Sequence, residues 1–203
     1  MALLNLKFKK RFSVAVFCGA SEGKSPKYAK AAREVGELIA ANNMRLVYGA
    51  GGTGLMGELA RAVLAGGGKV YGVSERVVAT FEKPIREILH RTAPNMQKRK
   101  REFIDHSNAF IVLAGGWGTF DELFEVMVMK EIVDRHRRHA PRSVYREDRP
   151  IVIINTDGYY DPALKMIERG IKEGFMMKED LKFFKVAKSP KEAFDFINSR
   201  RSK

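Results

Sequence analysis

Short apolar runs alternate with helical patterns along almost the whole chain, and this alternation limits the fold more than any other feature. The predicted strands cover residues 13–17, 45–48, 70–73, 109–113, 151–155 and 184–187. The predicted helices between and after them cover 26–41, 55–64, 81–89, 96–105, 119–133, 162–171 and 190–199. Strands that alternate with helices form parallel βαβ crossovers, so the sequence predicts an α/β fold, a doubly wound Rossmann-like parallel sheet with helices on both faces.

Length and composition favour one soluble domain over residues 1–203. With 203 residues, 45% of them apolar, the chain is large enough to cover a sheet on both sides. No apolar stretch approaches the roughly 18 residues of a membrane span. The single cysteine, Cys18, excludes an intrachain disulfide and favours a reducing compartment, so we expect a cytoplasmic protein. Residues 1–12 are interpreted as a basic tail.

The formal net charge of +13 exceeds what one phosphate pocket requires. Much of the excess lies in residues 135–149, which we interpret as a solvated basic insertion. An alternative is a nucleic-acid-binding module that uses this segment, although it has only Tyr145 as an aromatic residue for stacking on bases.

Glycines follow three of the predicted strands. They are found at Gly19 and Gly23, in the run 49–54, and in the run 115–118. Ligands of a doubly wound sheet bind beyond the carboxyl ends of its strands, so these three loops are expected to converge on one edge.

The run 114–122 stands between a strand and a helix. Backbone N–H groups and the helix dipole make such a position an anion site, and we expect a phosphate there. The Glu122 carboxylate would lie beside the phosphate. A structural alternative is that Thr119 and Glu122 form a T-x-x-E capping box, with Thr119 at the start of the helix.

A second glycine pattern suggests a rival ligand. Gly49, Gly51 and Gly54 satisfy G-x-G-x-x-G between a strand and a helix, and Glu75 follows about 20 residues later, as in dinucleotide-binding folds. The match follows the second strand rather than the first, which weakens a nicotinamide cofactor as an explanation.

Four consecutive cations, residues 98–101, lie on the predicted helix 96–105. Helical spacing distributes them around the axis, so one or two are expected to point toward the glycine edge, where an arginine offers a fork of donors to a phosphate or a leaving group. The histidines show no metal-ligand spacing, no P-loop lysine follows a glycine turn, and no G-x-S-x-G elbow is found. We therefore predict no metal and no cofactor.

With these motifs in view, the chain resembles the Lonely Guy family of cytokinin-activating phosphoribohydrolases, which are often mislabelled as lysine decarboxylases. The resemblance extends over nearly the whole chain. It rests on the segments 16–19, 46–49 and 54–57, on Met96 with Arg99 and Lys100, on 115–119 with Glu122, and on 155–160.

The resemblance implies hydrolysis of the N-glycosidic bond of a purine nucleoside 5′-monophosphate, AMP or an N6-modified relative, to free base and ribose 5-phosphate. It implies Arg99 and Glu122 as catalytic residues, and a homodimer or larger homo-oligomer with helix 119–133 as a contact element. The residues implied to bind substrate or phosphate are Gly19, Ser21, Gly51, Gly52, Met96, Lys100, Gly115, Gly116, Gly118 and Thr119.

The chain departs from the family pattern at Ala20, Ala50 and Ala114. One methyl group should preserve the backbone path, provided that Ala50 does not require a positive φ. These departures leave open a non-catalytic nucleotide or cofactor carrier of the same fold. A decarboxylase is disfavoured, because no lysine lies in a recognisable pyridoxal phosphate setting.

Overall fold

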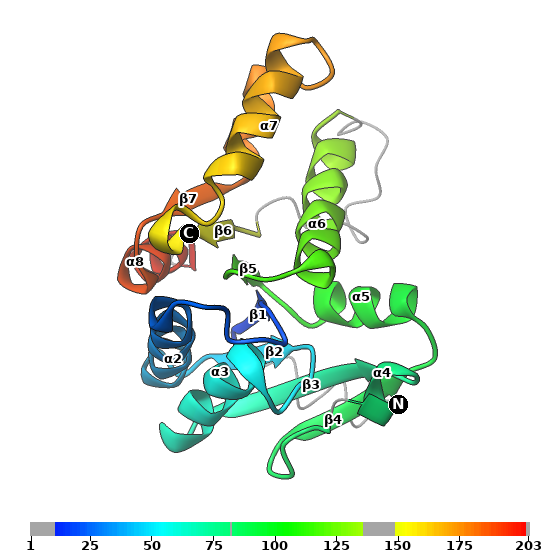
Figure 1. The fold of residues 1–203 in the computed structure, drawn as a ribbon, viewed down its shortest axis with the longest axis vertical. Helices are drawn as coiled ribbons and strands as arrows, with labels where there is room; N and C mark the ends of the chain where they lie inside the picture. Colours follow the sequence, from blue (N-terminus) through cyan, green and yellow to red (C-terminus); the bar gives the residue numbers. More distant parts are fainter. Residues whose placement is uncertain (1–10, 82, 136–148, 202–203) are drawn as a thin grey trace.

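The fold of this computed structural model is a seven-stranded parallel sheet flanked by helices (Figure 1). The structure describes residues 11–81, 83–135 and 149–201. The strands are β1 (Ser13–Phe17), β2 (Arg45–Tyr48), β3 (Lys69–Glu75), β4 (Leu89–Ala93), β5 (Ala109–Val112), β6 (Ile151–Ile154) and β7 (Lys185–Ala187). Their order, β4-β3-β2-β1-β5-β6-β7, confirms the predicted doubly wound arrangement.

Strand β1 marks the point where the direction of winding reverses. It pairs in parallel with β2 on one side and with β5 on the other. The loops after β1 and β5 therefore leave the same edge of the sheet in opposite directions and open a crevice between them, which is where open α/β sheets bind their ligands.

The helices are connected by short loops and cover both faces of the sheet. They are α2 (Pro26–Ala41), α3 (Gly54–Ala65), α4 (Val78–Phe81), α5 (Met96–Asp105), α6 (Trp117–Arg135), α7 (Asp161–Lys172) and α8 (Pro190–Arg201), with 3₁₀ turns η1 (Thr156–Gly158) and η2 (Lys178–Phe183). Figure 1 shows α6 and α7 both extending toward the same end of the molecule. None of the described helices is long and apolar enough to cross a membrane.

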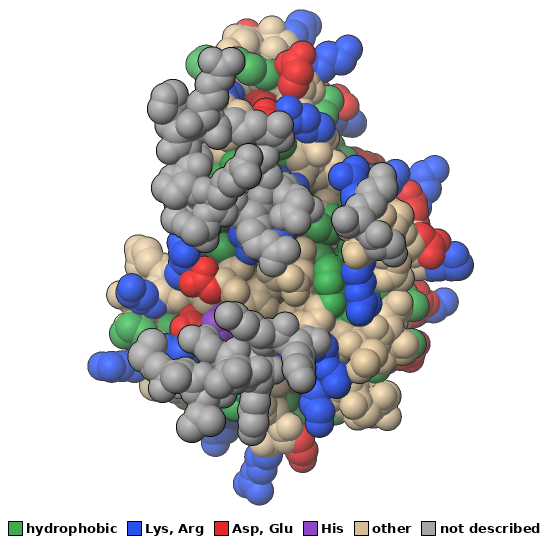
Figure 2. Space-filling model, turned by 180° about the vertical axis from the view of Figure 1, so that it is seen from behind, with side chains coloured by type: hydrophobic (Ala, Val, Ile, Leu, Met, Phe, Trp, Pro, Cys, Tyr) green, Lys and Arg blue, Asp and Glu red, His purple; other side chains and the backbone are tan. Residues whose placement is uncertain are grey.

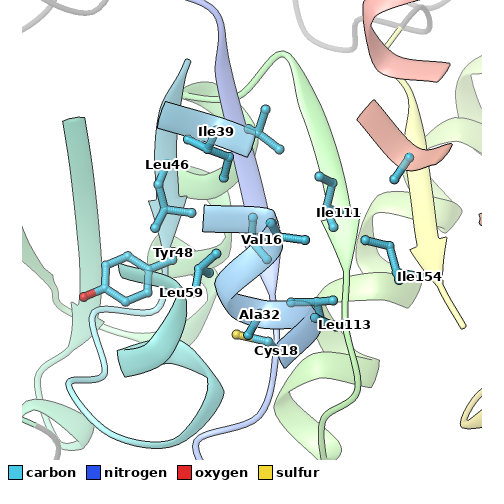
Figure 3. Packing of buried hydrophobic residues seen from close by; sticks show 14 of the residues in the cluster. Val16, Cys18, Ala32, Ile39, Leu46, Tyr48, Leu59, Ile111, Leu113 and Ile154 are labelled. Carbon is cyan, nitrogen blue, oxygen red and sulfur yellow. The ribbon is translucent and has the colours of Figure 1, made fainter. Parts of the chain in front are cut away.

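Alternate residues of the central strands contribute to two separate cores, because successive side chains of a strand point to opposite faces. Val16, Leu46 and Ile111 lie on the face covered by α2, α3 and α8 (Figure 3). Their strand neighbours Val47 and Phe110 belong to the other core, which α5 and α6 cover. Both faces of the central strands are therefore buried.

Local capping signals fix the starts of α2 and α5. The Ser25 hydroxyl accepts a hydrogen bond from the Lys27 backbone N–H at 3.3 Å, and Pro26 occupies the first turn, as predicted. The Asn95 side chain accepts from the Lys98 N–H at 2.9 Å and starts α5 at Met96. The direction in which α5 presents its cations is thereby set.

The predicted helix over residues 81–89 is wrong. The helix α4 ends at Phe81, and the segment from Leu89 to Ala93 forms β4, an edge strand paired with β3. Pro84 disfavours a continuous helix here. An edge strand has one covered side only, so β4 lacks the apolar run that identified the other strands.

The interpretation of residues 135–149 as a solvated insertion is wrong at its last residue; residues 136–148 lie outside the described part of the chain. Arg149 is buried, donates to the Ile104 carbonyl and to the Ser107 carbonyl at 3.3 Å, and lies over the Phe110 ring. Arg149 therefore satisfies carbonyls at the end of α5. Arg135 forms an ion pair with Glu131 at 2.7 Å.

Ala50 does adopt a positive φ, so the condition under which one methyl group would preserve the backbone path is not met. Its φ is +67°, in the left-handed region that favours glycine, and its side chain is buried. A strained alanine therefore stands in the loop after β2, beside the entrance to α3.

Candidate active site

A cavity of about 560 Å³ opens at the carboxyl edge of the sheet, where three glycine loops meet. Gly19 from the loop after β1, Gly49 from the loop after β2 and Gly115 from the loop after β5 all line it. The Gly19 N–H donates to the Ala114 carbonyl at 3.0 Å, which ties the first loop to the third. The predicted convergence of these three loops is confirmed.

The loop 114–118 leads into the amino end of α6, which starts at Trp117. At the start of this helix the Phe120 N–H donates to the Gly116 carbonyl at 3.1 Å. N–H groups of the first turn have no partners within their helix and act as anion donors. Open space lies beside Gly116 and Gly118, since a Cβ at either position meets nothing within 4 Å.

The alternative interpretation of Thr119 and Glu122 as a capping box is wrong. Thr119 and Glu122 both lie inside α6, and Thr119 is 3% exposed at its first turn. The Glu122 carboxylate accepts from Arg99 rather than from a backbone group of Thr119. Residues three apart are also neighbours within the interior of a helix, so T-x-x-E spacing does not by itself locate a helix start.

Arg99 of α5 reaches the cavity and is anchored from behind. Its Nε donates to the Val73 carbonyl at 3.0 Å, its Nη2 to the Gly49 carbonyl at 3.4 Å, and its Nη1 to Glu122 Oε1 at 3.0 Å. The guanidinium also lies 4.9 Å from the centre of the Phe103 ring. Contacts to β3, the loop after β2 and α6 therefore fix its position.

Glu122 is a buried carboxylate whose proton affinity is strongly changed. Burial raises the pKa of Glu122 to about 7, against the neighbouring charge of Arg99, which favours the ionised form. Glu122 and Arg99 are each 7% exposed, and both line the cavity. A carboxyl group with this pKa exchanges a proton near neutral pH, as a general acid or base requires.

Lys100 does not line the cavity, although it follows Arg99 directly. Its Nζ bridges Asp121 at 2.9 Å and Glu125 at 3.0 Å on the outer side of α6. The lysine side chain is 14% exposed. Its position indicates that it joins α5 to α6.

Most of the residues that the sequence singled out come together here. The cavity is lined by Gly19, Ser21, Met96, Arg99, Gly115, Gly116, Gly118, Thr119 and Glu122. Gly51, Gly52 and Lys100 are not among its lining residues. The Gly52 carbonyl instead accepts from Arg61 at 3.0 Å, within the turn that enters α3.

Several lining residues were missed by sequence reasoning. Tyr28, Val78 and Tyr159 form part of the wall, and the Tyr159 hydroxyl donates to the Gly115 carbonyl at 2.5 Å. Tyr159 lies in the segment 155–160, which carries part of the family resemblance, so that segment contained a signal. Nothing in the spacing of Tyr28 or Val78 distinguishes them from core residues.

Glu75 does not serve as the acid of a dinucleotide site. Its carboxylate accepts from the Val77 N–H at 2.8 Å and the Val78 N–H at 3.2 Å, and it is 8% exposed. The group that a ribose would need already binds the start of α4. Within residues 11–81, 83–135 and 149–201, no cluster of three His, Cys, Asp or Glu side chains is placed to hold a metal ion.

Comparison with known proteins fits this geometry. The family described as "Possible lysine decarboxylase" matches residues 56–197. A rice protein (Oryza sativa subsp. japonica) named as a probable cytokinin riboside 5′-monophosphate phosphoribohydrolase is 35% identical over 98% of this chain and 74% of its own length. An Arabidopsis thaliana cytokinin riboside 5′-monophosphate phosphoribohydrolase is 36% identical over 80% of this chain and 71% of its own.

The chain belongs to the Lonely Guy family. Solved structures with the same fold include the molybdenum cofactor carrier protein of Chlamydomonas rheinhardtii, with a TM-score of 0.67, 16% identity and coverage of 96% of this chain and 99% of that one. The molybdenum cofactor binding protein of Rippkaea orientalis gives 0.65 at 17% identity, covering 94% and 97%. At such identities the likeness concerns the fold alone.

The two neighbouring glycines of the loop after β5 give a matched test of this site. A Cβ at Gly115 would lie 2.1 Å from Thr119 Oγ1 and 2.9 Å from the Gly19 nitrogen, whereas a Cβ at Gly116 meets nothing. Gly115→Ala should lower the free energy of unfolding by about 1–3 kcal/mol through overpacking. Gly116→Ala should leave it unchanged or raise it by up to about 1 kcal/mol, because the unfolded chain loses freedom. Urea denaturation measures both, and equal effects would show that the loop is not packed as described.

Proposed function

We propose that this Lonely Guy protein hydrolyses the N-glycosidic bond of purine nucleoside 5′-monophosphates, releasing the free base and ribose 5-phosphate. The buried pair of Arg99 and Glu122 beside a helix-start anion site carries the proposal. Curated relatives at 35–36% identity are named for this reaction on cytokinin riboside 5′-monophosphates. AMP and its N6-isopentenyl derivative are the substrates to test.

The phosphate is proposed to bind at the start of α6. Open space beside Gly116 and Gly118 leaves room for it, and the first-turn N–H groups of α6 have no partners within the helix. Bound there, the phosphate acts as a handle that holds the ribose near Glu122, so that binding energy remote from the reacting bond contributes to catalysis. The more apolar part of the wall, which includes Leu55, Val78 and Met96, is left for the base.

In the reaction, the bond between C1′ of the ribose and the purine nitrogen breaks, and its electron pair leaves with the base. The ribose carbon becomes oxocarbenium-like, and water adds to it. Ionised Glu122 stabilises the positive charge and accepts a proton from the water, while the departing base takes up a proton from solvent. The products are ribose 5-phosphate and the free base.

Arg99 is the second proposed catalytic residue. Its anchored guanidinium favours the ionised form of Glu122, and it lines the cavity where the ribose and base would lie. Its backbone partners Val73 and Gly49 already hold it in place, so little reorganisation is needed when charge develops on the substrate.

The direct test is incubation with AMP or N6-isopentenyl AMP, followed by chromatography for free base and ribose 5-phosphate. Wild type should release both, and Glu122→Gln should lower kcat by about 10²–10⁴ because the base is lost. Adenosine, which lacks the phosphate handle, should be a poor substrate.

Glu131→Gln is the matched control, since Glu131 lies on the same helix, pairs with Arg135 rather than with α5, and does not line the cavity. It should retain turnover. Intact nucleotide after incubation with wild type, or undiminished turnover in Glu122→Gln, would refute the proposed reaction.

The pH dependence follows from the pKa of about 7 at Glu122. A base that must be ionised loses activity as the pH falls through its pKa, so kcat/KM should rise about tenfold per unit below pH 7 and level off above it. Substrate phosphate titrates near pH 6, so the residual activity of Glu122→Gln serves as the reference and should stay flat from about pH 6.5 to 8.5. A wild-type profile that falls with rising pH would instead assign Glu122 as a general acid.

We further propose that the protein acts as a homodimer that pairs through α6. This helix carries apolar residues on all sides, and Val128 and Ile132, one turn apart, are 48% and 45% exposed. Large apolar side chains that are exposed one turn apart on a helix are normally covered by another surface. The exposed side of α6 is therefore the proposed contact.

Light scattering tests the dimer. Wild type should have the mass of two chains, and Val128→Asp combined with Ile132→Asp should give one, because buried carboxylates oppose pairing. Leu89→Asp is the matched control on β4, where the leucine is also 48% exposed. A monomeric wild type, or dissociation by Leu89→Asp, would contradict pairing through α6.

Cys18 fits a reducing compartment, and we propose that the protein is cytoplasmic. The cysteine is free and buried, and it lines the cavity. Burial raises the pKa of its thiol, which therefore stays protonated. Fractionation of cells that express the chain tests the location.

A further inference from the structure

A second hollow, of about 550 Å³, lies at the opposite edge of the sheet, where β1, β2 and β3 begin. Its lining combines cationic side chains with a group of apolar ones. The distance along β3 from Lys69 to Glu75 is about 20 Å at 3.3 Å per residue. The hollow is therefore separate from the cavity that holds Arg99 and Glu122.

The charge of this hollow is strongly one-sided. Arg11, Arg45, Lys69 and Arg201 line it, against Glu87 as the only acid among the lining residues. Over the described parts of the chain, no ion pair of Arg11 or Lys69 is found, in contrast to Lys27 or Lys30 on α2, which pair with Asp157 and Glu34. Figure 2 shows Lys and Arg side chains around much of the rim on the back of the molecule, intermixed with acids.

Arg45 is the most informative of these cations. It is the first residue of β2 and only 9% exposed, so its guanidinium is held within the fold rather than in solvent. Burial, and then the positive charge of Arg11, lowers the pKa of Arg45. A bound anion would lessen the repulsion between Arg11 and Arg45.

The lining of the hollow also includes apolar side chains. Phe12, Leu64, Val70 and Leu89 contribute to it. A volume of this size matches pockets for one small molecule. A continuous nucleic acid would instead require an extended basic stripe with aromatic residues that stack on bases. Shape and charge therefore favour a compact anion over a polymer.

We propose that this hollow is a second ligand site, which binds a small polyanion of the diphosphate or triphosphate type through Arg11, Arg45, Lys69 and Arg201. Two sources share this chemistry: free inorganic polyphosphate, and the phosphate chain of a nucleoside diphosphate or triphosphate, whose organic part would contact the apolar side chains. The site does not depend on the hydrolytic activity.

The test is isothermal titration of the full chain with inorganic tripolyphosphate, and separately with ADP and ATP, at low and high salt. Arg11→Gln combined with Lys69→Gln should weaken tripolyphosphate binding at least about tenfold, since two charge-assisted contacts are lost. Lys30→Gln combined with Lys191→Gln removes the same charge from exposed positions of α2 and α8 and should change it less than about twofold. The side chains replaced in the two double variants lie near the surface. Thermal denaturation without ligand verifies that both variants fold.

Tighter binding of ADP or ATP than of inorganic polyphosphate would identify a nucleotide as the ligand, and equal affinities would identify the phosphate chain alone; either supports the site. The site is refuted if tripolyphosphate does not bind, or if both variant pairs weaken binding equally, which would indicate net charge only. Binding of single-stranded RNA without any binding of tripolyphosphate would refute it in favour of a nucleic-acid surface.

Discussion

The buried ion pair between Arg99 and Glu122 is the contact on which the arrangement of the site depends. Transfer of two charges out of water costs several kcal/mol per ion, and only good geometry with further hydrogen bonds offsets it. Arg99 meets this condition through the carbonyls of Val73 and Gly49. The pair therefore joins two strand ends to two helices, and its value lies in where it places charge rather than in added stability.

Lys100 helps to hold the ion pair of Arg99 and Glu122 in place. Successive residues of a helix are about 100° apart, so Arg99 and Lys100 meet α6 on different sides. Arg99 binds Glu122 on the cavity side, while Lys100 bridges Asp121 and Glu125 on the outer side. Neighbouring residues on both helices are thus engaged at once, which fixes the rotation of α6 about its axis and with it the direction of the Glu122 carboxylate.

The sheet was predictable from the sequence because central parallel strands are buried on both faces and read as apolar runs. The edge strand β4 was not, since one open side allows residues such as Arg91. The glycine loops located the cavity, and the paired motifs selected Arg99 and Glu122. The side of α5 on which Lys100 lies was not predictable, because helical spacing alone does not say which cation faces inward. The burial of Arg149 was missed because its partners are backbone carbonyls, which leave no trace in side-chain chemistry.

The contacts of Glu75 prevent its carboxylate from serving in a dinucleotide site. A dinucleotide fold would need a free acid at the end of this strand, but here the carboxylate holds the first N–H groups of α4. Val78, which those contacts position, forms part of the cavity wall. Release of Glu75 toward a ribose would therefore also free the start of α4 and part of the cavity wall. The same carboxylate cannot serve both tasks at once, so the two kinds of ligand would compete for one side chain.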